Sequence, residues 1–315
     1  MSRQPCSRFQ LILLSTVAAC LIAAAAEAQV VLRPKLQPKT QRTFHAENSV
    51  KQVLKLNGMD IETESVQFII AESSVGARAD DGSLRVSDSI KKLQQELTLP
   101  GIKLRFDSSN PDKKAPLPQL EPVLDVLRVI SKSRYTFVYD KSDKLQKVEG
   151  ANESLKDLEP AVRKSLEAQL GAEALLKQKK NESGRIVAKA VRKGEQWEHT
   201  SIQQLEAGQT LTVKHRYTYT GTVTRGKDTL HRITSKALEV TLTQDAPEGS
   251  PSKIIASKLK IAKGTGEILI DLKNGVIVLD SVSTQMTGTV KLEINGMTFD
   301  ATLDLTIATK SQLQQ

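Results

Sequence analysis

The residues best suited to acid–base or metal chemistry are four histidines, which are scattered along the chain: His45, His199, His215 and His231. No two of them stand at the short spacing from which histidines bind one metal ion. His215 shares the alternation phase of Tyr217 and Tyr219, so we expect all three on one side of a strand. There His215 could pair with His231 on the next strand as a polar group in a ligand pocket. The alternative is a partly buried histidine at the rim of a sheet.

The acidic residues form no recognisable catalytic pair. Asp80, Asp81 and Asp88 do not have the spacing of a calcium loop, and a hairpin turn explains them. Most carboxylates of the C-terminal strands fall on the polar phase, where solvent covers them. Asp280 falls instead on the apolar phase, so it marks either a break in strand register or a polar group in a cavity.

The sequence motifs of enzymes are missing. There is no nucleophile elbow, no phosphate-binding loop and no dinucleotide fingerprint. We therefore expect no catalytic residues, no metal and no cofactor, and we predict that the protein is not an enzyme. A hydrolase without a recognisable motif is the competing hypothesis, and a carboxylate beside His215 would favour it.

Aromatic residues are few, at 3% of the chain, and several cluster on two expected strands. They could line a hydrophobic pocket or simply pack in the core. Together with the polar positions above, they give the candidate ligand-binding residues Tyr135, Tyr139, His215, Tyr217, Tyr219 and Asp280.

The C-terminal region predicts three antiparallel strands. Apolar and polar residues alternate through 267–309, with Asn274-Gly275 and Asn295-Gly296 between the runs. Asn-Gly between alternating runs is the strongest short-range hairpin signal.

Two further blocks alternate in the same way. Asn57-Gly58 marks a hairpin in the first, and Trp197 opens the second. Residues 86–99 fit either a helix or a strand, and we favour a strand hairpin that turns at Pro100-Gly101. The apolar phase switches between Ala237 and Leu238, which predicts a β-bulge or a change of sheet face.

Two amphipathic helices are expected. Leu120, Val123, Leu124, Leu127 and Ile130 give the apolar face of the first, at 118–131. The second is predicted as one helix ending near residue 180, with its main part at 157–180. Gly171 should weaken it by about 1 kcal/mol relative to alanine.

Strand length predicts the overall shape. The run 276–294 would be about 60 Å long if straight, which is too long for a domain of this size. The strand must therefore bend, and Gly288 is the natural place. We predict an α+β fold, mainly antiparallel β, in which two amphipathic helices cover a strongly curved sheet or half-open barrel.

The N-terminus resembles an export signal. Arg3 and Arg8 precede an apolar run, and 26–28 fits the small-x-small cleavage rule. We expect a signal peptide at 1–28. Residues 17–20 also resemble a lipobox, in which Cys20 would carry a lipid anchor. The only other cysteine is Cys6, so the remaining chain would contain neither disulfides nor thiol chemistry.

Five segments follow from these patterns. They are the signal peptide 1–28, an extended tether at 29–42, a first β-rich half with one helix at 43–150, a helix and connector at 151–196, and a C-terminal antiparallel meander at 197–315. The net charge of +9 is spread along the chain without interleaved aromatic residues, so we do not expect nucleic-acid binding.

The order of these elements resembles a family of uncharacterised exported bacterial β-rich proteins. The residues that carry the resemblance are Phe106-Asp107-Ser108 after Pro100-Gly101, the 135–150 hairpin, Gly194-Glu195-Gln196-Trp197, the run 217–221 and the terminal Asn-Gly meander. In outline the architecture is similar to half-barrel carriers of lipoproteins and lipids in the bacterial envelope. The resemblance implies no assigned activity.

These observations together predict a non-enzymatic exported envelope protein, in the periplasm or at the cell surface, and peripheral to a membrane at most. Its trough would bind an apolar ligand or lipid. The alternative is a structural or protein-interaction module of the envelope that holds another envelope protein. Whether the trough is hollow or filled by its own side chains distinguishes the two.

Overall fold

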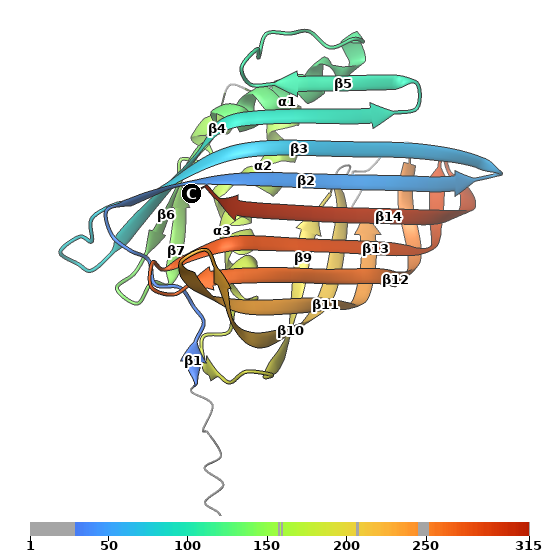
Figure 1. Cartoon of the computed structure of the whole chain (residues 1–315). Coiled ribbons are helices and arrows are strands. Elements are labelled where there is room, and N and C mark those ends of the chain that lie inside the picture. Colours follow the sequence, from blue (N-terminus) through green and yellow to red (C-terminus); the bar gives the residue numbers. More distant parts are fainter. Residues whose placement is uncertain (1–28, 157, 159, 206–207, 245–251, 315) are drawn as a thin grey trace, which may run out of the picture.

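The computed structural model describes residues 29–156, 158, 160–205, 208–244 and 252–314. The expected signal peptide and Cys20 lie outside these residues. Nearly all the strands form one antiparallel sheet of twelve, in the order β7-β6-β4-β3-β2-β14-β13-β12-β11-β10-β9, with β5 also paired to β4. The edge strands β7 and β9 do not pair in the described part of the chain. The predicted fold class, an open and curved antiparallel sheet with helices, is therefore confirmed (Figure 1).

The strands are long for a domain of this size. The N-terminal group is β2 (Thr40–Leu56), β3 (Met59–Val75), β4 (Leu84–Leu99), β5 (Ile102–Asp107), β6 (Arg134–Tyr139) and β7 (Leu145–Glu149). The C-terminal group is β9 (Gln196–Gln204), β10 (Gln209–Arg225), β11 (Asp228–Gln244), β12 (Ser252–Asp271), β13 (Val276–Ile294) and β14 (Met297–Leu313). A separate pair joins β1 (Val30–Val31) to β8 (Ala190–Val191).

The predicted hairpins are present. Asn57, Gly58, Asn295 and Gly296 all have positive φ, as tight Asn-Gly turns require, and Pro100-Gly101 joins β4 to β5. The phase switch in β11 is a bulge: His215 pairs with Ala237 and Lys214 with Glu239, which leaves Leu238 without a partner position.

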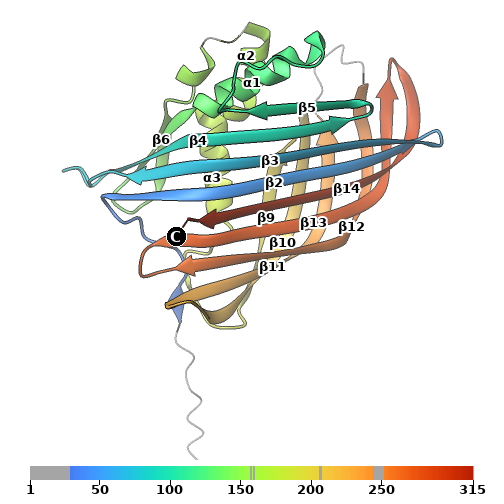
Figure 2. The ribbon, with the colours of Figure 1, turned by 45° about the horizontal axis from the view of Figure 1, so that its top comes forward.

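The sheet curls strongly, so that parts of the C-terminal strands turn behind β2–β4 (Figures 1 and 2). Gly288 lies in β13 where the backbone of β12 comes very close. A Cβ there would overlap the carbonyl of Lys258. The glycine therefore permits the tight approach that a curled sheet needs. A second register irregularity between β12 and β13 leaves Val278 without a paired residue. Val276 and Val278 share the sequence phase of Met286 but belong to a separate apolar cluster.

Aliphatic side chains fill the concave side of the C-terminal group. The main cluster spans β10–β14, and Met286 and Leu305 at its centre are 0% and 1% exposed. The cluster contains no helix residue, so the side chains of the curled sheet bury one another.

Helices cover the concave side of the N-terminal group (Figure 1). Helix α1 (Glu121–Lys132) follows a short 3-10 turn at Pro118–Leu120 and buries Leu124 and Leu127 against β4 and β5. Val123, predicted on this apolar face, is 37% exposed. The helix presents Val126 and Val129 to a second helix instead, so its apolar surface is divided between two partners.

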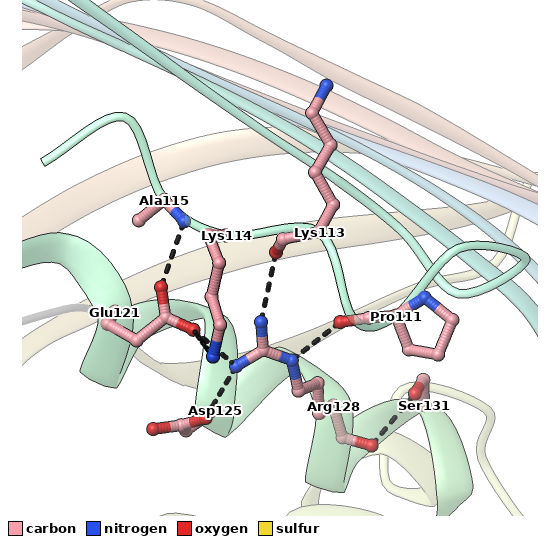
Figure 3. Close-up of polar contacts among 8 residues, drawn as sticks. All are labelled: Pro111, Lys113, Lys114, Ala115, Glu121, Asp125, Arg128 and Ser131. Carbon is pink, nitrogen blue, oxygen red and sulfur yellow. Dashed lines mark hydrogen bonds and ion pairs between the residues drawn. The ribbon is translucent and has the colours of Figure 1, made fainter. Parts of the chain in front are cut away.

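Arg128 fixes the loop before α1. Its guanidinium donates to the carbonyls of Pro111 (2.6 Å) and Lys113 (3.0 Å), and it pairs with Glu121 and Asp125. Glu121 in turn accepts a hydrogen bond from the backbone N–H of Ala115 (Figure 3). One arginine thus satisfies backbone groups of a loop that has no partner strand.

The second predicted helix is two helices, which corrects the single continuous helix. Helix α2 (Pro160–Leu170) and helix α3 (Ala172–Ser183) meet at Gly171, whose ψ of 162° is extended. A Cβ at Gly171 would overlap the carbonyl of Glu167, so glycine permits a complete break where only weakening was predicted.

The segment predicted as a tether is docked along part of its length. Leu32 is fully buried in a cluster with Val191 and Ile233, and β1 pairs with β8. The apolar residues of 29–42 are too few to show a period, so sequence pattern could not reveal this packing.

Candidate ligand site on the concave face

A chain of amide side chains crosses the centre of the concave face. Asn48 Nδ2 donates to Gln67 Oε1 (3.2 Å), Gln67 Nε2 to Gln95 Oε1 (2.8 Å), and Gln95 Nε2 to Ser65 Oγ (2.7 Å). Strand register explains this chain. Asn48 lies opposite Gln67 on β3, and Gln67 lies opposite Gln95 on β4, so three amides fall in one row.

This row lies on the same face as the aliphatic core. Val50 follows Asn48 on the same face of β2 and pairs with the buried Ile307 of β14. Leu54, further along that face, pairs with the buried Leu303. The side chains of Asn48 and Gln67 are half-buried, unlike the buried residues of β14. The concave face is thus filled at β10–β14 but polar and partly open at β2 and β3.

Helix α3 packs against β7 and β9, the two edge strands of the sheet. Arg185, just after the helix, donates from Nη1 to Asp280 Oδ1 (3.1 Å) and from Nη2 to Asp280 Oδ2 (2.6 Å). Both features predicted for Asp280 occur: a register irregularity lies two residues away at Val278, and the carboxylate forms a bidentate ion pair on the concave side. Burial lowers the pKa of Arg185, but the attraction of Asp280 outweighs it, so the pKa is raised.

A second charged group, Lys179, lies on α3 six residues before Arg185. Lys179 Nζ is 5.3 Å from the centre of the Phe137 ring and 4.0 Å from a carboxylate oxygen of Glu182. Burial lowers the pKa of Lys179, whereas Glu182 and Asp88 raise it, and the net shift is upward. Burial raises the pKa of Asp88, whose Oδ1 has no hydrogen-bond partner among the described residues.

Three of the six predicted site residues surround the Arg185–Asp280 pair or are part of it. Tyr217 is 4% exposed and stacks on Trp197, with ring centres 6.1 Å apart. Burial raises its pKa to about 12. His215 is 5% exposed, and burial, with smaller contributions from Arg185 and His199, lowers its pKa to about 4. Asp280 is the third.

The other predicted residues lie apart from that pair. Tyr219 is buried, and its hydroxyl is 2.7 Å from Nδ1 of His231. His231 therefore partners Tyr219, and the position opposite His215 is occupied by His199. Tyr135 and Tyr139 are half-buried against α3, where Tyr139 interacts electrostatically with Lys179 and Asp88.

Several polar residues of the concave face were not identified from the sequence. Arg185 lies 95 residues from Asp280, and the members of the amide row come from three strands. The one available signal was phase: Asn48 and Gln95 each lie between apolar residues of the same phase, as Asp280 does.

Two shallow depressions occur elsewhere. One of about 540 Å³ is lined mainly by Ser and Thr of β11–β13, and most of its side chains face away from the concave side. The other, of about 350 Å³, lies beside Arg42, Asp271 and Asn274. The candidate residues border neither depression.

Within the described ranges, no group of three or more His, Cys, Asp or Glu side chains has a metal-binding arrangement. No described helix has the length and apolarity needed to cross a membrane.

No family model and no curated protein sequence matches the chain. The resemblance to an exported β-rich family therefore stays a prediction. Solved structures share β-rich architecture at low similarity. Lipovitellin, in a structure of its lipid–protein interactions, aligns with a TM-score of 0.37 and 7% identity over 89% of this chain, which spans only 26% of lipovitellin. Neisserial surface protein A gives a TM-score of 0.20 and 6% identity, covering 87% of this chain and 99% of its own. A BenF-like porin from Pseudomonas fluorescens gives 0.20 and 8%, covering 88% and 100%. At such TM-scores these similarities carry no argument about function.

Proposed function

We propose that the protein is a non-enzymatic, exported carrier that holds an amphipathic lipid on its concave face. The observation that carries the proposal is the half-buried amide row on the same concave face as the aliphatic core. Amphipathic lipids combine an aliphatic chain with oxygen acceptors, and this face offers partners for both.

The amide row has donor capacity beyond its own hydrogen bonds. A primary amide carries two N–H donors, and the row uses one from each of Asn48, Gln67 and Gln95. The remaining donors suit the carboxylate or ester oxygens of a lipid. Aliphatic residues lie on both sides of the row, with Val50 and Leu54 toward one end of the strands and Ile69 toward the other. The amide row adds polar positions on β2, β3 and β4 to His215 and Asp280, which were predicted from the sequence.

A dansyl-labelled fatty acid tests the proposal. We expect it to bind the wild-type chain, and we expect Gln67→Leu to weaken binding about tenfold, because the leucine removes two hydrogen bonds of the row. Gln285→Leu is the matched control, since Gln285 is exposed on the outer face of β13. Absence of binding to the wild type, or equal affinity for Gln67→Leu and the wild type, would refute the lipid site.

The alternative is a structural or protein-interaction module of the envelope. The self-filled core of β10–β14 supports it, because this half of the concave face leaves no room for a ligand. If the fatty acid fails to bind while the wild-type chain retains one specific protein from an envelope extract, the interaction module is the better function.

A further inference from the structure

The two ends of the long strands differ in the chemistry of their turns. At one end, the turns β2–β3, β4–β5 and β13–β14 consist of Asn57-Gly58, Pro100-Gly101 and Asn295-Gly296, without a charged residue. The connections 206–207 and 245–251 lie outside the described residues and are not part of this comparison. We call these three turns, together with Met59 and Met297, the apolar rim.

Two of these turns share a four-residue pattern that ends in an exposed methionine. They are Leu56-Asn57-Gly58-Met59 and Ile294-Asn295-Gly296-Met297, and the methionines are 63% and 61% exposed. These are the two highest exposures among the large apolar side chains of the described residues.

Sheet register brings the two tips together. Ala301 of β14 pairs with Leu56 of β2, and Leu56 pairs with Met59. Met297 is four residues from Ala301, so the two methionine Cα atoms lie within about 24 Å of each other. Figures 1 and 2 show both hairpins projecting at the same side of the molecule.

The opposite end of the strands is charged. Its turns include Arg78 and Asp81, the segment 140–144 with two aspartates and two lysines, and the turn Arg225-Gly226-Lys227-Asp228. Arg78 and Asp143 join two of these turns through an ion pair of 2.7 Å. Charged groups lose far more favourable hydration when they enter a membrane than uncharged turns with methionine tips do.

We propose that the apolar rim docks on a lipid bilayer surface, with Met59 and Met297 inserted and the charged end facing water. The tips are separate and project from hairpins, an arrangement that suits insertion between lipids. A protein interface is instead typically a continuous surface rich in aromatic residues. Lys55 and Lys253 behind the tips are each paired with an acid, Asp60 and Glu293. Docking therefore needs no anionic lipid. The inference rests on the rims alone and not on a ligand in the trough.

Site-specific fluorescence tests the docking. Met59→Trp and Met297→Trp are mixed with vesicles of phosphatidylcholine and phosphatidylethanolamine that carry acyl-chain bromine, and the signal of Trp197 in the parent chain is subtracted. Bromine should quench about half of the added fluorescence. Val31→Trp is the matched control, because Val31 is 50% exposed but lies in β1, and it should stay unquenched. Quenching that is equal at all three positions, or absent at the tips, overturns the proposal.

Flotation provides a second measurement. The double variant Met59→Asp, Met297→Asp should bind these vesicles about tenfold more weakly than the double variant Met59→Leu, Met297→Leu, and raising salt should not change the ratio. Equal binding of the two, or a ratio that salt abolishes, also overturns it. In a different outcome, the double aspartate variant abolishes capture of an envelope protein while tryptophan at the tips stays unquenched. That result would overturn membrane docking and identify the rim as a protein-binding surface. The fatty-acid affinity of the same variants distinguishes docking of the rim from binding in the trough. Variants that no longer dock on vesicles should still bind the fatty acid with unchanged affinity.

Discussion

The two halves of the concave face are covered in different ways. In the C-terminal half, β10–β14 curl until their own aliphatic side chains meet, around Met286 and Leu305. In the N-terminal half, helices cover the strands, and polar groups such as Gln67 lie on the concave side of β2–β4. Self-packing favours dry aliphatic contact, whereas separate covering elements leave space for polar side chains and solvent. Binding is therefore expected in the N-terminal half, and the C-terminal half supplies stability.

The largest difference between the halves should appear in stability. Met286→Ala removes a fully buried side chain from the self-packed half and should lower the free energy of unfolding by about 4 kcal/mol. Ile69→Ala removes a half-buried side chain of β3 and should cost about 1 kcal/mol. Urea unfolding measures both, and Met297→Ala, at an exposed tip, should change little. Equal losses for Met286→Ala and Ile69→Ala would erase the distinction between the halves.

His215 is buried on β10 beside the edge strand β9, and its titration should affect stability next most strongly. Its pKa is about 4 in the folded state and 6.5 as the ordinary value. A histidine with a lowered folded pKa contributes stability above pH 6.5 that is lost as pH falls toward 4. The shift corresponds to about 3 kcal/mol. His215→Leu should therefore lose less stability than the wild type between pH 7 and pH 4. The difference between the two proteins cancels the titration of His231 and Asp88, and parallel pH profiles would contradict the prediction.

A smaller effect is expected where α3 joins the halves. Asn181 Nδ2 donates to the carbonyl of Thr200 (3.0 Å), and Asn181 Oδ1 accepts from the N–H of Ile202 (3.3 Å). Asn181→Ala should lower stability by about 1 kcal/mol and speed hydrogen exchange at the Ile202 amide, because the edge of β9 loses its partner. Lys180→Ala is the control at an exposed neighbour. Unchanged exchange at Ile202 would show that α3 does not protect this edge.

Local features of the fold were predictable because they depend on neighbouring residues. The hairpins at Asn57-Gly58, Pro100-Gly101 and Asn295-Gly296, the bulge beside Ala237 and the close backbone approach at Gly288 each follow from turn chemistry or alternation. Asp280 was also recognisable as a polar residue on an apolar phase.

The remaining features depend on pairings that alternation does not encode. The amide row requires the registers of β2, β3 and β4 together, and Arg185 meets Asp280 only because α3 closes the gap between β7 and β9. The break at Gly171 was underestimated because helix propensity gives only the free-energy cost of glycine relative to alanine. It does not reveal that a Cβ at this position would overlap the carbonyl of Glu167. The burial of Leu32 had no signal, since one leucine has no period.

The pairing of β14 with β2 has a consequence for biogenesis. Residues 44–56 of β2 obtain their second partner only from residues 301–313, at the far end of the chain. A ribosome makes β2 early, so this 17-residue strand waits with one unpaired edge until almost the whole chain has followed. Contacts of such large sequence separation form slowly, and open edges promote aggregation meanwhile. Truncation by even the last strand should therefore leave the middle of the sheet, and not its periphery, exposed to other chains.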